Sequence, residues 1–135
     1  MQKRRDFLKI SLVTSAGLVA ATVLPASAAQ DSKETIFAYA QDHQGRWEGK
    51  AGSHAPVVTI EGDKVTMETK HGMSEAHYIV KHSLRDSSGN VLGEQVFFSQ
   101  DKKAISTYVI EGKYTELYAL SFCNIHDLWV TQFSK

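Results

Sequence analysis

Apolar and polar residues alternate with a period of two over most of the chain beyond residue 55, a pattern typical of half-buried β-strands. Short turns rich in Gly, Asp, Ser and Asn separate the alternating segments. The polar stretch at 29–45 has few apolar anchors, and we expect it to form a loose N-terminal arm. The segments predicted as strands are 56–60, 64–69, 76–85, 91–98, 104–110, 116–123 and 128–133.

About seven short strands with a turn every eight to twelve residues indicate an all-β fold. The architecture we expect is an immunoglobulin-like antiparallel β-sandwich or barrel, formed by a single domain at 46–135. A domain of this length buries only a modest core.

The alternation also predicts which side chains face the core. In the sixth predicted strand, Tyr118, Leu120 and Phe122 share one face, which we assign to the core, so Cys123 is expected on the outer face. The same count in the third predicted strand turns His77 away from the core. We therefore expect a site on the outer surface of the sheet.

Residues 1–28 are typical of an export signal, with a basic stretch at 3–9, a weakly apolar run at 10–24 and an Ala-x-Ala cleavage site. Paired arginines followed by Phe-Leu-Lys resemble the twin-arginine signal, which a receptor reads and which is not an anchor. An ordinary secretory signal is the alternative. We expect a periplasmic protein exported by the twin-arginine route, without a membrane span in its mature form because 10–24 is short for one.

Charge and cysteine content narrow the function classes. The formal charge of the whole chain is zero, and the net charge of +3 on residues 1–28 leaves about −3 on the remainder. No basic patch emerges, so we do not expect a nucleic-acid partner. The single cysteine excludes an internal disulfide, so the core or a metal must supply the stability.

Cys123 and His126 form a Cys-x-x-His pair, and a thiolate with an imidazole suits iron, copper or zinc. His71 and His77 bracket a short loop that ends where a strand begins, and His54 stands just before the first predicted strand. The alternative is that the histidines are unrelated surface residues and the thiol is inert.

Three segments, in order along the chain, resemble the superoxide reductase family, which includes the neelaredoxins and desulfoferrodoxins. The resemblance implies a seven-stranded immunoglobulin-like fold, in agreement with the independent strand count. One iron centre is expected, because a single cysteine cannot supply the four-cysteine rubredoxin-like site that some family members carry. The segments are the stretch from Trp47 to GSHAPV at 52–57, HGMSEAHYI at 71–79, and ELYALSFCNIHDLW at 116–129.

The resemblance further implies one iron (Fe²⁺/Fe³⁺) with four equatorial imidazoles and an axial thiolate from Cys123. The position opposite sulfur is open to superoxide, which is reduced to hydrogen peroxide with electrons from an external donor. Backbone amides near Asn124 and Ile125 are candidates to hydrogen-bond the sulfur and tune its donor strength. The implied histidine ligands are His54, His71, His77 and His126.

Two histidines match no ligand position of the family. They are His43 and His82, and we interpret His82 as a packing or edge residue.

The chain departs from the family pattern just before the first ligand. Gly52 and Ser53 occupy the places of a Glu-Lys pair, whose lysine attracts superoxide and whose glutamate can occupy the sixth position of the iron. We expect Lys50 and Glu48 to take over these two roles; the alternative is that both are solvated loop charges. Asp127 stands where the family usually has glycine.

The expected function is therefore a superoxide reductase that defends the periplasm against oxidative stress. A non-enzymatic iron protein that transfers electrons or senses a small ligand is the alternative. A cupredoxin-like copper carrier is disfavoured, because blue-copper sites use two histidines and an axial methionine, and no methionine follows Cys123. The expected partners are superoxide, an external electron donor and, as an open option, further copies of the chain.

Overall fold

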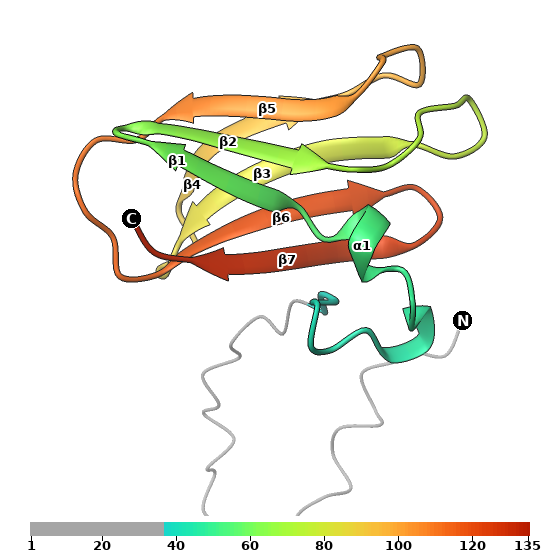
Figure 1. Cartoon of the computed structure of the whole chain (residues 1–135), viewed down its shortest axis with the longest axis horizontal. Coiled ribbons are helices and arrows are strands. Elements are labelled where there is room, and N and C mark those ends of the chain that lie inside the picture. The colour runs from blue at the N-terminus through green and yellow to red at the C-terminus, as the bar shows by residue number, and fades with distance from the viewer. Residues whose placement is uncertain (1–36) are drawn as a thin grey trace, which may run out of the picture. The chain divides into compact units, whose positions relative to one another are not determined.

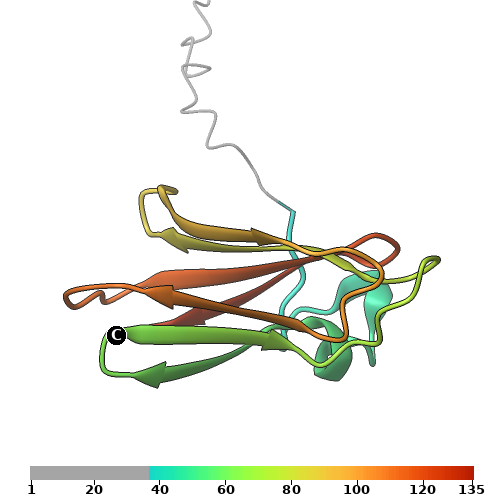
Figure 2. The same ribbon diagram turned by 90° about the horizontal axis from the view of Figure 1, so that it is seen from above.

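The computed structural model describes residues 37–135, which form two antiparallel sheets packed face to face (Figures 1 and 2). The three-stranded sheet has the order β1-β2-β5 and the four-stranded sheet the order β4-β3-β6-β7. The predicted all-β sandwich of seven strands is confirmed. The elements are η2 (Gly45–Trp47), α1 (Ala51–His54), β1 (Val57–Glu61), β2 (Lys64–Thr69), β3 (Ile79–Asp86), β4 (Val91–Val96), β5 (Ala104–Val109), β6 (Leu117–Cys123) and β7 (Asp127–Phe133).

The predicted export signal at 1–28 lies outside the described residues, as does most of the predicted arm at 29–45. Within the described part, Tyr39 is bound to β7 in a short parallel bridge. Its amide donates to the carbonyl of Leu128 and its carbonyl accepts from the amide of Val130, each at 2.8 Å. No helix among residues 37–135 is long and apolar enough to cross a membrane.

Cys123 faces the interior, so the predicted outer position of this thiol is wrong. Leu117 and Ala119 are 0 % exposed and Cys123 is 1 % exposed, whereas Phe122 is 40 % exposed. Both faces of β6 are apolar, and the larger side chains cover the outer surface of the sheet. The smaller side chains of β6 fill the space between the two sheets, where packing is close. The prediction had assigned the face with the larger side chains to the core.

His82, which was interpreted as a packing or edge residue, lies in the core on the same face as Leu84, and a register shift in β3 brings Ile79 to this face as well. The pairing of β3 with β6 shifts between Ile79 and Lys81, which changes the phase of the two-residue alternation. Ile79, His82 and Leu84 are consequently all fully buried.

A layer of hydrogen-bonded polar side chains crosses the core and joins the two sheets. Thr69 Oγ1 lies 2.8 Å from His82 Nε2 and 2.7 Å from Ser121 Oγ, and Ser106 Oγ lies 2.7 Å from His82 Nδ1. A neutral imidazole offers one donor and one acceptor nitrogen, so this network can be fully satisfied. Along each strand, the layer separates an apolar cluster around Met67 from a smaller one that contains Cys123.

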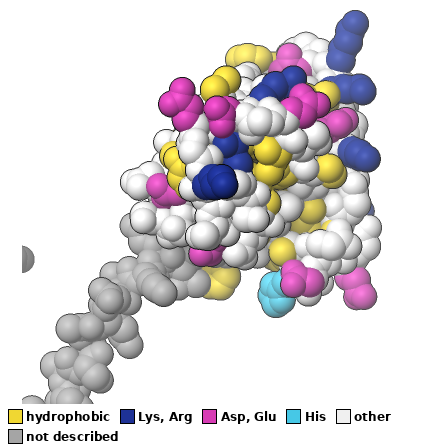
Figure 3. All heavy atoms as spheres, turned by 60° about the vertical axis from the view of Figure 1, so that its left-hand side comes forward, with side chains coloured by type: hydrophobic (Ala, Val, Ile, Leu, Met, Phe, Trp, Pro, Cys, Tyr) yellow, Lys and Arg dark blue, Asp and Glu magenta, His cyan; other side chains and the backbone are white. Residues whose placement is uncertain are grey.

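Charged side chains at the end of the sandwich opposite α1 are interspersed by sign, as the face in Figure 3 shows. Lys135 Nζ, which is only 7 % exposed, lies 2.9 Å from Asp63 Oδ1 and donates to the carbonyl of Gly112 at 2.7 Å. These contacts tie the C-terminal residue to the turns at this end.

Protonation of His82 should destabilise the fold. Burial lowers the pKa of His82 from 6.5 to about 4, so the unfolded chain binds the proton more tightly and stability falls as the pH drops from 6.5 towards 4. We expect His82 to account for a loss of about 2 kcal/mol between pH 7.5 and pH 5. Urea unfolding of the metal-free protein at both pH values measures the total loss, and the difference between wild type and a variant at His82 gives the part due to His82.

The variant His82→Gln cannot take up this proton and should lose that part of the pH dependence, whatever its stability at pH 7.5. The matched control is His43→Gln, which changes an exposed histidine and should keep the wild-type dependence. Equal pH dependence in wild type and His82→Gln would contradict the assignment.

Gly93 on β4 makes room for the ring of Tyr108 on β5, because a Cβ atom at Gly93 would lie 2.3 Å from Tyr108 Cδ1. We expect Gly93→Ala to lower the free energy of unfolding by about 1–3 kcal/mol, the usual cost of overpacking. In the control Gly52→Ala, the added methyl group meets no atom within 4 Å. Denaturant titration should show a loss for Gly93→Ala and none for Gly52→Ala.

Candidate metal centre

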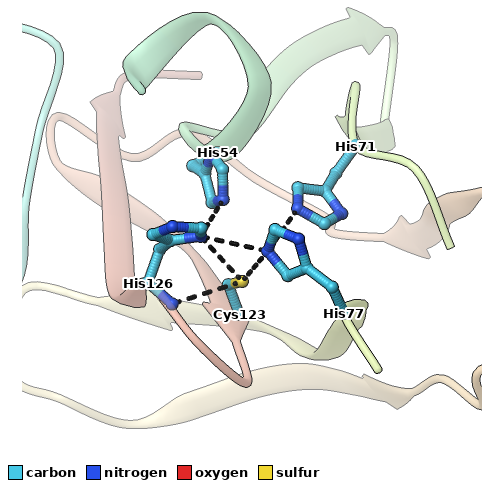
Figure 4. A group of neighbouring side chains, drawn as sticks. All are labelled: His54, His71, His77, Cys123 and His126. Atoms are coloured by element: carbon cyan, nitrogen blue, oxygen red, sulfur yellow. Dashed lines mark hydrogen bonds between the residues drawn. The ribbon is translucent and has the colours of Figure 1, made fainter. Parts of the chain in front are cut away.

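Five side chains converge at one end of the sandwich, where α1, the β2–β3 connection and the β6–β7 turn come together (Figures 1 and 4). Their candidate ligand atoms all lie within 4.8 Å of one another. Figure 4 shows the rings and the thiol pointing towards one another from different segments of the chain. The five residues are His54, His71, His77, Cys123 and His126, so the structure brings together every residue predicted as a metal ligand.

The nitrogen atoms have the spacing of ligands around one metal ion. Three separations are 3.0 Å: His54 Nε2 to His126 Nδ1, His126 Nδ1 to His77 Nε2, and His77 Nε2 to His71 Nε2. A square of nitrogens, each about 2.1 Å from a central metal, has sides of about 3.0 Å. The three observed distances therefore fit three consecutive sides of such a square.

The thiol fits a fifth position off this square. Cys123 Sγ lies 3.2 Å from His77 Nε2 and 3.7 Å from His126 Nδ1. A sulfur about 2.3 Å from the metal and perpendicular to the square would lie about 3.1 Å from each nitrogen. Four imidazoles and one thiolate suit a transition metal, and five donors exceed the four of a usual structural zinc site.

Hydrogen bonds to the outer ring nitrogens of two histidines fix which nitrogen faces the centre. His54 Nδ1 donates to the carbonyl of Lys50 at 3.0 Å and also lies 2.8 Å from Ser53 Oγ. His71 Nδ1 donates to the carbonyl of Gly72. Both rings thus present Nε2 to the cluster.

His126 presents Nδ1 instead, because only two residues separate it from Cys123 in the tight β6–β7 turn. Its backbone amide donates to Cys123 Sγ at 3.4 Å, a contact that lowers the electron density on sulfur. The amides of Asn124 and Ile125 were the predicted donors to this sulfur. The amide of Asn124 donates to the carbonyl of Tyr78 at 3.2 Å instead, and no bond from the amide of Ile125 to the sulfur is present among the described residues.

The side chain of Asn124 links the loop that carries His77 to the turn that carries Cys123. Its Nδ2 donates to the carbonyl of Ala76 at 3.1 Å, and its Oδ1 accepts from the amide of Tyr78 at 3.1 Å. These two bonds flank His77 in sequence and hold its backbone beside β6. Asn124 was predicted to act on the sulfur through its amide, and the role of its side chain was not foreseen.

Burial favours the neutral form of three imidazoles of the cluster. Burial, together with the neighbouring histidines, lowers the pKa of His54 from 6.5 to about 4. Burial also lowers the pKa of His71 and His126. Metal ligands must be deprotonated, so a metal at this site does not have to displace a proton from these three imidazoles near neutral pH.

The cluster opens onto a hollow of about 400 Å³ that three of the histidines line and the sulfur of Cys123 does not. Lys50 lines this hollow, and its positive charge lowers the pKa of His126. Glu48 lies at a separate hollow beside His43. The structure thus places Lys50 at the mouth of the site and Glu48 away from it.

Two residues that contact the cluster were given no role at the metal site predicted from the sequence. Ser53, noted only as a departure from the family pattern, contacts His54, and the indole of Trp47 lies edge-to-face with the ring of His126 at a centroid distance of 4.6 Å. Proximity of Ser53 to His54 in sequence could have indicated the first contact. Nothing in the sequence pairs Trp47 with His126.

The family model of desulfoferrodoxin matches residues 44–132, and the chain belongs to this family. No curated protein sequence matches the chain.

Three solved structures are similar in fold. The superoxide reductase (1Fe-SOR) of Giardia intestinalis is 24 % identical with a TM-score of 0.55, over 62 % of this chain and 98 % of its own. The neelaredoxin-type superoxide reductase of Ignicoccus hospitalis is 24 % identical with a TM-score of 0.55, over 72 % and 92 %. The superoxide reductase of Treponema pallidum is 24 % identical with a TM-score of 0.51, over 61 % and 67 %.

The cluster should bind one metal ion per chain, with the thiolate of Cys123 as a ligand. Titration of the metal-free protein with Co²⁺ should saturate at one equivalent and produce a sulfur-to-cobalt charge-transfer band in the near ultraviolet. Cys123→Ser should lose this band and bind Co²⁺ more weakly. A band that persists in Cys123→Ser would contradict ligation by sulfur.

Proposed function

We propose that this protein is a periplasmic mononuclear non-haem iron protein that reduces superoxide to hydrogen peroxide with electrons from an external donor. The convergence of four imidazoles and one thiol within 4.8 Å carries the proposal. Membership of the desulfoferrodoxin family supports iron as the metal. The solved structures of similar fold from Giardia intestinalis and Ignicoccus hospitalis are superoxide reductases, which supports superoxide as the substrate.

The residues that would hold the iron are His54, His71, His77, Cys123 and His126. When bound, iron would supply the one-electron redox chemistry, with a thiolate that donates electron density to it. Burial of Cys123 would shield the metal from the solvent on the side of the core. The hollow lined by His71 and His77 leaves the opposite side open to a small anion.

Lys50 would attract the superoxide anion into this hollow. It belongs to the same short segment as His54, and its carbonyl is bound to the ring of that histidine. Its exposed ammonium is free to approach an anion in the hollow. The sixth-position role of Glu48 remains a prediction that would require a movement of its loop.

A non-enzymatic iron protein of the same fold is the second candidate. Gly52 and Ser53 place no charged side chain directly before His54, and the hydroxyl of Ser53 is engaged with His54 and with the carbonyl of Lys50. The absence of a lysine at this position weakens the attraction of an anion, which favours electron transfer or binding of a small neutral ligand. Both candidates share the metal centre and differ in the rate with superoxide.

The periplasmic location is supported by the twin-arginine-like segment at 3–9 and the cleavage pattern that ends at residue 28. We propose 1–28 as the signal peptide and 46–135 as the iron-binding domain. Export by the twin-arginine route would deliver the protein folded, with its metal in place.

Pulse radiolysis of the Fe²⁺-loaded protein tests the proposed reaction. A bimolecular rate constant with superoxide near the diffusional ceiling of about 10⁹ M⁻¹s⁻¹ is expected for an enzyme. We expect Lys50→Ala to slow the reaction several-fold and to weaken its salt dependence, because steering of an anion is screened by salt.

The matched control is Lys113→Ala, which removes an exposed lysine from the loop before β6, at the other end of the strand from Cys123. It should keep both the rate and its salt dependence. A wild-type rate several orders of magnitude below the ceiling would favour the non-enzymatic candidate. Native protein that contains copper or zinc and no iron would overturn both.

A further inference from the structure

Asp127, the first residue of β7, has an unusual backbone for its type. Its φ is +64°, and it is the only non-glycine residue with positive φ among residues 37–135. Aspartate tolerates this left-handed conformation better than most residues, but at a cost that glycine avoids. Such a conformation persists where surrounding contacts hold it, so the contacts of its side chain need an account.

The carboxylate of Asp127 binds a residue that is 80 positions away in sequence. Trp47 Nε1 donates to Asp127 Oδ2 at 2.8 Å. A hydrogen bond with an ionised acceptor is roughly twice as strong as one between neutral groups. This bond ties η2, which ends at Trp47, to the turn that carries two of the proposed metal ligands.

The bound indole lies against a metal ligand. The rings of Trp47 and His126 are 4.6 Å apart between centroids, with an interplanar angle of 88°. The guanidinium of Arg46 lies 4.5 Å from the centroid of the same indole. Trp47 is thus held by the carboxylate of Asp127 and contacts both Arg46 and the imidazole of His126.

His126 lacks the direct support that two other histidines of the cluster have. The outer nitrogens of His54 and His71 donate to backbone carbonyls, whereas no described residue hydrogen-bonds Nε2 of His126. Metal-binding histidines usually have such a partner, which fixes the orientation of the ring. Among residues 37–135, Trp47 supplies the only aromatic ring from outside the cluster that packs against His126, and it does so edge-to-face.

We propose that Asp127 is a positioning residue, which holds the indole of Trp47 against His126 and so fixes the orientation of this ligand. The inference deepens the proposed function, since it rests on His126 as a metal ligand. The carboxylate supports the imidazole through an intervening indole rather than by a direct bond. Asp127 therefore adopts a left-handed backbone conformation that glycine would adopt without strain, and its side chain supplies the acceptor for the indole of Trp47.

Three variants distinguish the hydrogen bond between Trp47 and Asp127 from the negative charge of Asp127 and from its positive φ. Asp127→Gly removes the acceptor and relieves the positive φ. Asp127→Asn removes the charge, keeps an oxygen acceptor and tolerates the same φ. Trp47→Phe keeps a ring and removes the N–H donor. The matched control is Glu111→Ala, which removes an exposed carboxylate from the loop between β5 and β6.

Nuclear magnetic resonance of the metal-free protein tests the bond itself. The indole N–H signal of Trp47, assigned by its absence in Trp47→Phe, should move and exchange faster with solvent in Asp127→Gly. It should stay in place in Glu111→Ala. An unmoved signal in Asp127→Gly would overturn the proposal, whether or not the protein binds metal.

Titration with Co²⁺ tests the consequence for the ligand. Asp127→Gly and Trp47→Phe should each lower the affinity for Co²⁺ by about tenfold or more, the usual effect of losing a residue that orients a ligand. Each should also alter the visible d–d bands of bound Co²⁺, while the urea midpoint of metal-free Asp127→Gly stays close to that of wild type. The double variant should lose no more than the larger single loss, because the two residues act as one unit.

Asp127→Asn should keep most of the affinity. Weak binding by Asp127→Asn equal to that of Asp127→Gly would overturn the proposal in favour of a purely electrostatic effect. Wild-type affinity and unchanged bands in Asp127→Gly would overturn it as well, as would additive losses in the double variant. Failure of the wild-type protein to bind any metal would instead count against the proposed function, and the indole signal would still decide whether the bond exists.

Discussion

The site depends above all on the pairing of β3 with β6. This pairing sets Ile79 opposite Cys123, so the loop that carries His77 and the turn that carries His126 leave the sheet side by side. The side-chain period of a strand is two, so a slip of one residue would turn Cys123 outwards and disperse the ligands. Burial of Cys123 and of its neighbours on the inner face of β6 therefore fixes the register and the site together.

The interior of the sandwich serves two purposes that a polar layer keeps apart. On the side of the layer away from α1, the cluster around Met67 buries the larger number of apolar side chains. On the side towards α1, a smaller apolar cluster that contains Cys123 borders the metal centre. His82 and its hydroxyl partners hold the two sheets together between these regions. A satisfied polar layer specifies how the sheets align more sharply than apolar contacts do, because an unpaired buried donor is costly.

The metal centre is positioned by contacts between segments that are distant in sequence. The side chain of Asn124 binds the backbone on both sides of His77, and Asp127 binds Trp47 across 80 residues. Asn124 lies within the Cys-x-x-His pair and Asp127 follows it directly, so the β6–β7 turn organises ligands on other loops as well as its own. The departure from the family at Asp127 thus changes how the site is supported and leaves its donor set intact.

The seven strands and their turns could be predicted from the chain alone, because alternation and turn chemistry are local properties. The five residues of the metal cluster were predicted through the resemblance of three segments to the superoxide reductase family, since residue chemistry alone left unrelated surface histidines as an alternative. The face of β6 that is buried could not be predicted, since both faces are apolar and only packing against the second sheet selects the smaller side chains. The inward position of Ile79 follows from a register shift that leaves no mark in the residue pattern. The bond between Asp127 and Trp47 likewise required the tertiary structure, because nothing local relates a carboxylate after β6 to an indole before α1.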